Sequence, residues 1–202
     1  MIRVRNVDKS FGERVLFHDF SIDIEDREFV VFMGESGRGK TTLLNMIGGL
    51  EPFDGGTIDV DGIDVSDRRV KRKYFGEKVG FLFQNFVLIE DKTVRYNLSL
   101  VDKKNRSDIS DEDALRYVGM EDKADSKVYT LSGGEQQRVS LARLMVKKCD
   151  VILADEPTGS LDEKNARRVM EILLRLNRMG KTVIVVSHSP QFKELGVRVV
   201  EL

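Results

Sequence analysis

The sequence predicts an α/β fold with a mainly parallel sheet and a helical segment inserted into it. The short continuous apolar runs EFVVFMG, DVILADEP and TVIVVSH are typical of strands buried on both faces. Helix-favouring segments alternate with these runs, which is the pattern of a parallel sheet covered by helices. Between about residues 85 and 145 the chain is charged and helix-favouring throughout, so we expect a helical insertion there.

Length and composition limit the possible classes of protein. The 202 residues suffice for one substantial domain, and 41% hydrophobic against 33% charged residues indicates a globular chain. Because 33 basic residues balance 34 acidic ones, the overall charge does not favour nucleic acid or an anionic membrane as a partner. The chain start lacks the apolar core of a signal peptide, and no stretch reaches the ~18 apolar residues of a membrane-spanning helix. We therefore expect a soluble chain, with its one cysteine, Cys149, buried as a small apolar residue.

The first half is expected to be rich in strands. IRVRNV and VLFHDFSIDI alternate apolar and polar residues, as strands with one buried face do. After a glycine-rich loop, TTLLNMIG is expected to form a helix that stops at Gly48 and Gly49. GGTIDVDGIDV should then form a hairpin about Asp61 and Gly62, and VGFLFQ a further strand.

The second half is expected to place helices around two buried strands. SDEDALRYVGM has a good helix cap at Ser110. EKNARRVMEILLRLNRMG should form a helix that stops at Gly180 and has one apolar face, made of Val169, Ile172, Leu173 and Leu176. The basic run from Arg68 to Lys78 could contact lipid headgroups or a partner, but a solvated charged face is the favoured interpretation.

The segment GESGRGKTT, Gly34 to Thr42, contains the pattern G-x-x-x-x-G-K-[ST] and is called the phosphate loop below. It follows a buried strand and opens a helix, the setting that phosphate binding requires. Glycines let backbone N–H groups close around phosphate oxygens, and the helix start adds a favourable dipole. Lys40 would reach the β and γ phosphates, the Thr41 hydroxyl would ligate Mg²⁺, and Arg38 would supply only its backbone amide. An ordinary glycine-rich turn is the alternative.

Asp155 and Glu156 end the apolar run VILADEP. Ligands of open α/β sheets bind at the carboxyl ends of the strands, so both acids should face the phosphate site. Asp155 suits Mg²⁺ through water, because this ion keeps much of its hydration. Glu156 suits the polarisation of an attacking water, a role that typically contributes ~10²–10⁴-fold to a rate. A solvated acidic turn is the alternative, which the phosphate loop disfavours.

A second segment, LSGGEQQR from Leu131 to Arg138, also has the features of a helix start that holds a phosphate. Ser132 and Glu135 form an S-x-x-E capping box and leave further N–H groups free. Gly133 and Gly134 carry no side chain that would keep an anion away. From the chemistry alone, a well-capped helix without a ligand stays an alternative.

Taken together, these motifs resemble those of ABC-transporter nucleotide-binding subunits, and the resemblance covers essentially the whole chain. LSGGEQQR matches the signature motif that separates these proteins from other P-loop ATPases, and is called the signature segment below. The resemblance implies a P-loop NTPase, RecA-like α/β fold with a small antiparallel β part. It also implies a single ATPase domain, 1–202, in which residues 1–84 and 146–202 form the nucleotide-binding core. Residues 85–145 would form a helical subdomain that carries the signature segment.

The resemblance also explains why one chain has two phosphate-type helix starts. Similar proteins dimerise head to tail, and the signature helix of each subunit caps the γ-phosphate bound to the other. The implied partners are a second copy of this chain, in an ATP-dependent dimer, and an integral membrane permease, with no nucleic acid. The implied cofactors are ATP and Mg²⁺. The chain would be cytoplasmic, and peripheral on the inner face of the cell membrane through the permease.

Further positions carry over from the family by motif. Gln84 matches the Q-loop glutamine that touches Mg²⁺, and His188, in VVSHSP, matches the switch histidine that contacts the γ-phosphate. Phe11 matches the aromatic residue that stacks on adenine, here without the usual tyrosine hydroxyl. Ser189 stands where many relatives have an acid, and His18 matches no motif and is expected at the surface or in a strand.

The implied site can be summarised by role. The expected catalytic residues are Glu156 and His188, and the expected metal ligands are Thr41, Gln84 and Asp155. The expected cofactor-binding residues include Ser160 and Asp162 of the GSLD segment, placed between subunits. The others are Phe11, Gly34, Ser36, Gly37, Arg38, Gly39, Lys40, Thr41, Thr42, Ser132, Gly133, Gly134 and Glu135.

Three stretches, QNFVLIEDKTVRYNL, GEQQRVSLAR and DEPTGSLDEKN, resemble the MacB/LolD-like branch of the family. That branch includes macrolide exporters, lipoprotein-release ATPases and lactococcin-type bacteriocin exporters, and FVLIEDKTV is most similar to the last group. The resemblance implies a subunit that drives export of a peptide or bacteriocin, a drug or a lipoprotein, with no regulatory domain. Two alternatives stay open: an FtsE-like regulatory ATPase that moves no substrate, and a soluble ATPase acting on nucleic acid. The balanced charge and the absence of a coiled-coil insertion disfavour the second.

Overall fold

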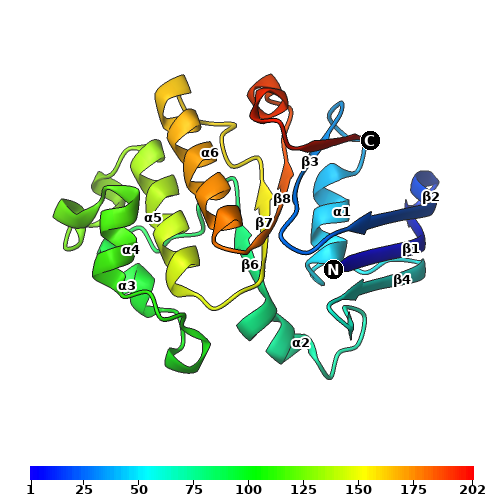
Figure 1. The fold of residues 1–202 in the computed structure, drawn as a ribbon, viewed down its shortest axis with the longest axis horizontal. Coiled ribbons are helices and arrows are strands. Elements are labelled where there is room, and N and C mark those ends of the chain that lie inside the picture. Colours follow the sequence, from blue (N-terminus) through cyan, green and yellow to red (C-terminus); the bar gives the residue numbers. More distant parts are fainter.

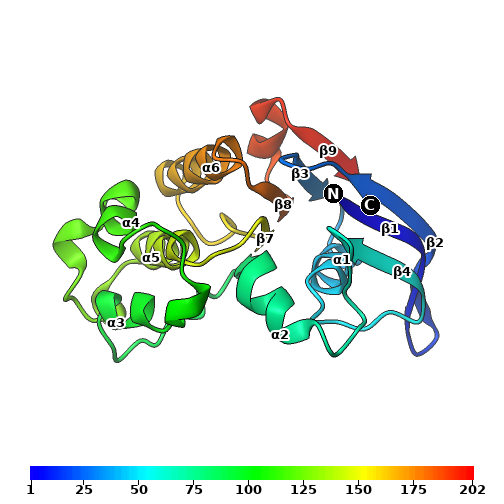
Figure 2. The same ribbon diagram turned by 60° about the horizontal axis from the view of Figure 1, so that its bottom comes forward.

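The computed structural model describes all residues, 1–202, and divides the strands between two sheets (Figures 1 and 2). The antiparallel sheet has the order β2-β1-β4-β5, with β1 at Ile2–Phe11, β2 at Arg14–Ile24, β4 at Gly55–Val60 and β5 at Ile63–Asp64. The parallel sheet has the order β6-β7-β8-β3-β9. Its strands are β3 (Phe29–Met33), β6 (Val79–Leu82), β7 (Val151–Asp155), β8 (Thr182–Val186) and β9 (Arg198–Glu201). The predicted fold class is confirmed.

The helices gather in two places. α1 (Lys40–Ile47) lies beside the antiparallel sheet, and α2 (Lys71–Lys73) runs into a π-helical turn, Tyr74–Lys78 (Figure 1). At the other end of the molecule lie α3 (Val94–Ser99), α4 (Asp111–Val118) and α5 (Gly133–Val146), with α6 (Glu163–Arg178) next to α5 (Figure 2). Short 3₁₀ turns cover Lys103–Asn105, Glu121–Lys123, Val128–Thr130 and Pro190–Leu195. The division into subdomains at residues 85 and 145 stays a prediction.

Two hydrophobic cores lie on opposite faces of the parallel sheet. Successive side chains of a strand point to opposite faces, so β3 contributes to both. Val30 and Phe32 pack with α1 and the antiparallel sheet in a cluster of 20 buried residues. Val31 and Met33 pack in a cluster of 29 buried residues that includes side chains of α3, α4, α5 and α6. Burial on both faces explains why the apolar run of β3 is continuous. A strand packed on both faces also holds the start of the phosphate loop that follows it.

Several local predictions are confirmed. Asp61 and Gly62, with φ of 52° and 78°, form a two-residue turn that pairs Val60 with Ile63. Ser110 caps α4 by accepting a hydrogen bond from the backbone N–H of Asp113. The predicted apolar face of α6 is buried, Cys149 is buried, and His18 is exposed on β2.

Other features differ from the expectation. β1 continues to Phe11 because it pairs with β2 along its whole length, and the unexpected β9 adds a short fifth strand beside β3. The basic run is not a uniformly solvated face: Tyr74 is buried, and its hydroxyl donates to the carbonyl of Ile47, 2.7 Å away, at the end of α1. None of the helices has the length and apolar content needed to cross a membrane.

Candidate active site

A cavity of about 670 Å³ lies beside the phosphate loop. It brings together residues that the sequence predicts from five separate stretches: Phe11, the phosphate loop, Gln84, Glu156 and His188. From the phosphate loop it takes Ser36, Gly37, Gly39, Lys40, Thr41 and Thr42. The lining is completed by Arg14, Leu16 and Val186, which were not expected from the sequence.

The phosphate loop has a conformation that only glycine adopts easily at three positions. Gly34, Gly37 and Gly39 have φ of 139°, 82° and 89°. Gly39 is the cap residue of α1 and brings no side-chain hydrogen bond, so the first N–H groups of α1 have no side-chain cap. The Lys40 ammonium is buried and donates to the carbonyls of Gly34 (2.8 Å) and Glu35 (2.7 Å). The phosphate loop therefore folds around the Lys40 ammonium, and the first backbone N–H groups of α1 carry no side-chain cap.

Asp155 lies at the end of β7, facing the first turn of α1. The Thr41 hydroxyl donates to Asp155 Oδ1 at 2.9 Å. Burial raises the pKa of the Asp155 carboxyl above its usual range, and the negative charge of Glu156 adds to the shift. The hydrogen bond from Thr41 and the positive charge of Lys40 oppose it. A cation bound here would relieve an unfavourably buried carboxylate.

Glu156 adopts a backbone conformation that is rare for its residue type. Its φ is 44°, in the left-handed region, while its backbone N–H donates to the carbonyl of Val186 at 2.9 Å. His188 Nδ1 lies 2.8 Å from Glu156 Oε1, and the Ser187 hydroxyl lies 3.3 Å from Oε2. The carboxylate is held from two sides at the cavity wall, a suitable position for a base. Strain at this position is characteristic of functional sites.

Phe11 and Arg14 face each other at the tip of the β1–β2 hairpin. Gly12 and Glu13 form the two-residue turn between them, so both side chains reach the cavity. The Arg14 guanidinium also donates to the carbonyl of Gly37 in the phosphate loop. The sequence contained a signal for Arg14, because a Gly-containing two-residue turn pairs the residues on either side of it.

The signature segment is not part of this cavity. Ser132 caps α5 and its side chain accepts from the backbone N–H of Glu135, whose carboxylate accepts from the backbone N–H of Ser132, so the predicted capping box is present. Hydrogen bonds from the backbone N–H and the hydroxyl of Ser132 to the Glu135 carboxylate lower the pKa of this carboxyl. Gly133 is exposed, whereas Gly134 is buried, and a Cβ there would lie 2.5 Å from Asn165 Cγ. Only Gly133 therefore leaves space for a ligand, and Gly134 is required by packing against α6.

α5 and α6 are joined by polar contacts near the turn that carries Glu156. Gln137 is buried and donates to the carbonyl of Pro157 at 2.8 Å, one residue after Glu156. Arg138 donates to Asn165 Oδ1 (2.7 Å), and Asn165 donates to Asp162 Oδ2 (2.7 Å). Asp162 also caps α6, and Ser160 before it is exposed. The signature helix is thereby connected to both the Glu156 turn and the GSLD segment.

Gln84 lies two residues beyond the end of β6, at an exposed position of the cavity lining. The chain after it is strained, because Phe86 and Val87 have φ of 61° and 49°. Arg143 donates to the carbonyls of Val87 (2.6 Å) and Phe86 (3.2 Å), and Ser140 donates to the carbonyl of Phe86 (2.8 Å). Sequence reasoning missed these two residues of α5, which hold the turn after Gln84 in place.

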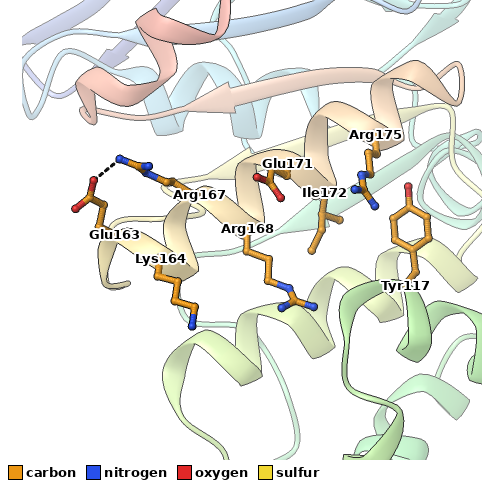
Figure 3. Close-up of a pocket in the computed structure, with 8 residues that line it drawn as sticks. All are labelled: Tyr117, Glu163, Lys164, Arg167, Arg168, Glu171, Ile172 and Arg175. Carbon is orange, nitrogen blue, oxygen red and sulfur yellow. Dashed lines mark hydrogen bonds and ion pairs between the residues drawn. The ribbon is translucent and has the colours of Figure 1, made fainter.

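A second hollow of about 630 Å³ runs along α6 and contains none of the predicted site residues (Figure 3). Tyr117 of α4 lies opposite the α6 side chains, and Arg167 pairs with Glu163 at 2.6 Å. The other lining residues are Lys164, Arg168, Glu171, Ile172 and Arg175. Charged side chains on solvent predominate, so this groove resembles an ordinary solvated helix face.

Comparison with known proteins agrees with these motifs. A family model described as ABC transporter matches residues 17–159, well over half of the chain. The chain belongs to the ABC transporter family. Among curated relatives, the macrolide export ATP-binding/permease protein MacB of Campylobacter jejuni is 40% identical over 209 residues, covering 100% of this chain but 33% of that protein. The glutamine transport ATP-binding protein GlnQ of Bacillus subtilis is 38% identical over 207 residues, covering 99% of this chain and 86% of that protein.

Solved structures support the same assignment. A dimeric structure of a post-hydrolysis state of the ATP-binding cassette MJ0796, bound to ADP and Pi, has a TM-score of 0.85 and 35% identity. It covers 100% of this chain and 94% of that one. This ABC chain spans about a third of the length of the macrolide export relatives it matches. As a cassette of this family, the chain is an ATPase.

Proposed function

We propose that this chain is the nucleotide-binding subunit of a transporter, in which two head-to-tail copies bind ATP and Mg²⁺ and drive a separate permease. The observation that carries the proposal is the separation of the signature segment from the cavity. Ser132 and Gly133 at the start of α5 are exposed, and neither lines the cavity of its own chain. This location fits a role toward the phosphate bound by a second copy.

The residues present fit a nucleoside triphosphate with Mg²⁺. The open start of α1 and the Lys40 ammonium provide donors for phosphate oxygens. Thr41 and Asp155 meet at 2.9 Å, and the Gln84 amide lines the same cavity, so three oxygen-bearing groups are available to a hard cation. When bound, Mg²⁺ would neutralise charge on the phosphate oxygens and polarise the phosphoryl group. Phe11 would stack on the base at the far end of the cavity.

The proposed catalytic roles follow from the contacts of Glu156. Its carboxylate, held by His188, would accept a proton from the attacking water. His188 would keep this carboxylate oriented and present its other ring nitrogen toward the γ-phosphate. Ser132 and Gly133 of the second copy would close the site from the opposite side, where Ser160 and Asp162 of the GSLD segment would also contact the partner.

A groove of about 370 Å³ beside the Gln84 turn is suited to receive the permease. Its lining includes Phe81, Leu100 and Leu144, together with the cations Arg143 and Lys147. Leu100 is 47% exposed, and nearby Val87 on the Gln84 turn is 49% exposed. The acid Asp102 also lines the groove. We propose that an amphipathic permease helix docks here, because exposed apolar side chains beside a groove suit the apolar face of such a helix. Arg143 contacts both the groove and the Gln84 turn, and would connect the permease to the nucleotide site.

For cargo, we propose export of a peptide or bacteriocin, a drug or a lipoprotein. The macrolide export relatives and the sequence resemblance to the same branch support this direction. The relative named for glutamine transport is 38% identical to this chain, almost as much as the macrolide export relative at 40%. Sequence identity therefore does not determine the cargo, and the permease has to be identified directly.

The experiment uses Glu156→Gln protein with ATP and Mg²⁺, which should bind nucleotide, hydrolyse it ~10²–10⁴-fold more slowly and accumulate as a dimer. Light scattering would measure the dimer, and a pull-down from detergent-solubilised membranes of the source organism would identify its partner. Lys40→Ala is the matched control, because it should prevent nucleotide binding and therefore recover neither dimer nor permease. Recovery of ribosomal or DNA-repair proteins without any membrane protein would overturn the transport proposal. A bound membrane protein without transport in reconstituted vesicles would indicate an FtsE-like role.

A further inference from the structure

A buried lysine lies against the aromatic ring that faces the cavity. The Lys9 ammonium is 4.3 Å from the centroid of the Phe11 ring, and Lys9 is only 4% exposed. The same ammonium donates to Glu51 Oε1 at 2.6 Å and to the carbonyl of Pro52 at 2.8 Å. A cation attracts the face of an aromatic ring, and the attraction is stronger where water is excluded.

The donor count explains what this contact does for the ring. A lysine ammonium has three N–H donors, and Glu51 and Pro52 use two of them. The third N–H remains for the face of the Phe11 ring, so the ring is the remaining partner of the buried ammonium. With this contact in place Phe11 is still 49% exposed at a hairpin tip, where an aromatic side chain without such a contact would rotate freely.

Neighbouring backbone contacts keep the lysine itself in position. The backbone N–H of Ser10 donates to Asp54 Oδ2 at 2.7 Å, and that of Asp54 donates to the carbonyl of Asp8 at 2.8 Å. The end of β1 is thus attached to the segment that follows α1, from which Glu51 and Pro52 also come. This arrangement holds the end of β1 close to the C-terminal end of α1, the helix that follows the phosphate loop.

We propose that Lys9 is a positioning residue for the nucleotide base, which holds the Phe11 ring in the plane on which the base stacks. The inference rests on the proposed role of Phe11 as the stacking residue. Phe11 also lines the cavity, and the Lys9 ammonium occupies one face of its ring, so the base would stack on the opposite face. A ring that is held in place before binding loses less freedom when the base arrives, which increases affinity.

The test compares a ligand with a base to one without. Dissociation constants for ADP and for inorganic pyrophosphate, both with Mg²⁺, would be measured by calorimetry on the full chain. Lys9→Met should weaken ADP binding about fivefold and leave pyrophosphate binding unchanged, since only the base loses its support. Phe11→Ala should weaken ADP binding about tenfold, again without effect on pyrophosphate. Lys9→Arg, which keeps a cation beneath the ring, should retain most of the ADP affinity.

Lys92→Met is the matched control, because Lys92 also lies over an aromatic ring, that of Tyr96 at 5.9 Å, away from the cavity. It should leave both dissociation constants unchanged. If Lys9→Met binds ADP as the wild type does, or loses ADP and pyrophosphate equally, the positioning role is wrong. If Phe11→Ala also leaves ADP binding unchanged, the stacking role within the proposed function fails; if only Lys9→Met has no effect, stacking stands and this inference alone fails.

Discussion

Two helix starts in this molecule have similar sequences and opposite local chemistry. α1 begins after Gly39, which is in the left-handed conformation and brings no side-chain cap. α5 begins at Ser132, where a capping box satisfies the backbone N–H groups of Ser132 and Glu135. Both starts are rich in glycine and both have a positive dipole end. The difference is that the first backbone N–H groups of α1 have no side-chain cap and suit a ligand of the same chain, whereas the start of α5 is capped by its own side chains.

Location agrees with this difference. The start of α1 lies in a cavity with Thr41, Glu156 and His188 around it, while Ser132 and Gly133 of α5 are exposed and outside that cavity. A helix start that is capped by its own side chains can remain on the surface until a second copy brings a phosphate to its remaining N–H groups. We therefore expect substitutions at α1 to act on nucleotide binding, and substitutions at α5 to act on assembly.

The largest effect on binding is expected at α1. Lys40→Ala removes the only ammonium that contacts the phosphate loop carbonyls, and ATP affinity should fall about 100-fold because hydrogen bonds to charged groups are strong. Calorimetry on the isolated chain measures it. Lys164→Ala, an exposed lysine in the first turn of α6, is the control and should bind normally. If Lys40→Ala binds ATP with an unchanged dissociation constant, the start of α1 is not the phosphate-binding site of this chain.

A pair of neighbouring substitutions sharpens the comparison at α5. Gly133→Ala should leave the monomer intact, since the added Cβ would meet only Phe86 at 3.7 Å, but should reduce dimer-dependent hydrolysis about tenfold by keeping the partner's phosphate away. Gly134→Ala should instead lower the melting temperature, since its Cβ would lie 2.5 Å from Asn165.

Hydrolysis at several protein concentrations and a thermal melt of each variant separate the two effects. Nucleotide affinity of the Gly133→Ala monomer serves as the internal reference and should equal that of the wild type. If Gly133→Ala hydrolyses ATP normally while forming a normal dimer, the signature segment has no role at the partner's phosphate.

A smaller effect is expected from the charge of Asp155 next to α1. Its pKa is raised in the folded chain, mainly by burial, so the folded state holds its proton to higher pH than the unfolded state does. The free energy of unfolding therefore falls as pH rises from the usual aspartate pKa to the raised pKa of the folded state, and the whole cost is present above the latter. Asp155→Asn should raise the melting temperature without nucleotide at pH 7.5 by about 2 °C.

The stabilisation should shrink as the pH is lowered into the range where the wild-type carboxyl is protonated. Thermal melts from pH 4.5 to 7.5 measure it, with Asp150→Asn as a control on an exposed acid before the same strand. A constant difference across this range would contradict the burial argument. The same variant should lose Mg²⁺-dependent hydrolysis.

The smallest effect is expected from Arg14. Its guanidinium is exposed and contacts Gly37, so it adds positive charge to the open end of the cavity without closing the phosphate loop. Arg14→Gln should weaken ATP binding about threefold, and the difference should disappear in high salt, as for other exposed charges. Titrations at two salt concentrations measure this. Persistence of the effect at high salt would show that Arg14 makes a buried contact with the nucleotide.

Most of the candidate site could be predicted from the sequence because its motifs are local. The phosphate loop, the acids at the end of β7 and the capping box of α5 each depend on residues a few positions apart, so their patterns are visible in one dimension. Arg14, Ser140, Arg143 and Lys9 were missed because they act across the fold, on backbone or rings from other elements. Gly134 was interpreted only as space for an anion, since its packing partner, Asn165, is 31 residues away on α6.

The fold follows the same rule. β3, β7 and β8 were predictable from continuous apolar runs, because burial on both faces leaves no room for polar residues. β9 was not, because four residues at a sheet edge, two of them charged and exposed, carry little pattern. The burial of Tyr74 within a basic run also depends on a distant carbonyl, that of Ile47.

Asp155 and Glu156 oppose thermal stability at two adjacent positions, one through a desolvated charge and the other through a backbone angle of 44°. A left-handed backbone costs a residue other than glycine roughly 1–2 kcal/mol, so Gly or Asn would be tolerated better at position 156. Random mutagenesis screened for heat resistance alone would consequently accumulate substitutions at this pair and return inactive proteins. A library intended to produce a more robust cassette has to hold both codons fixed and select elsewhere.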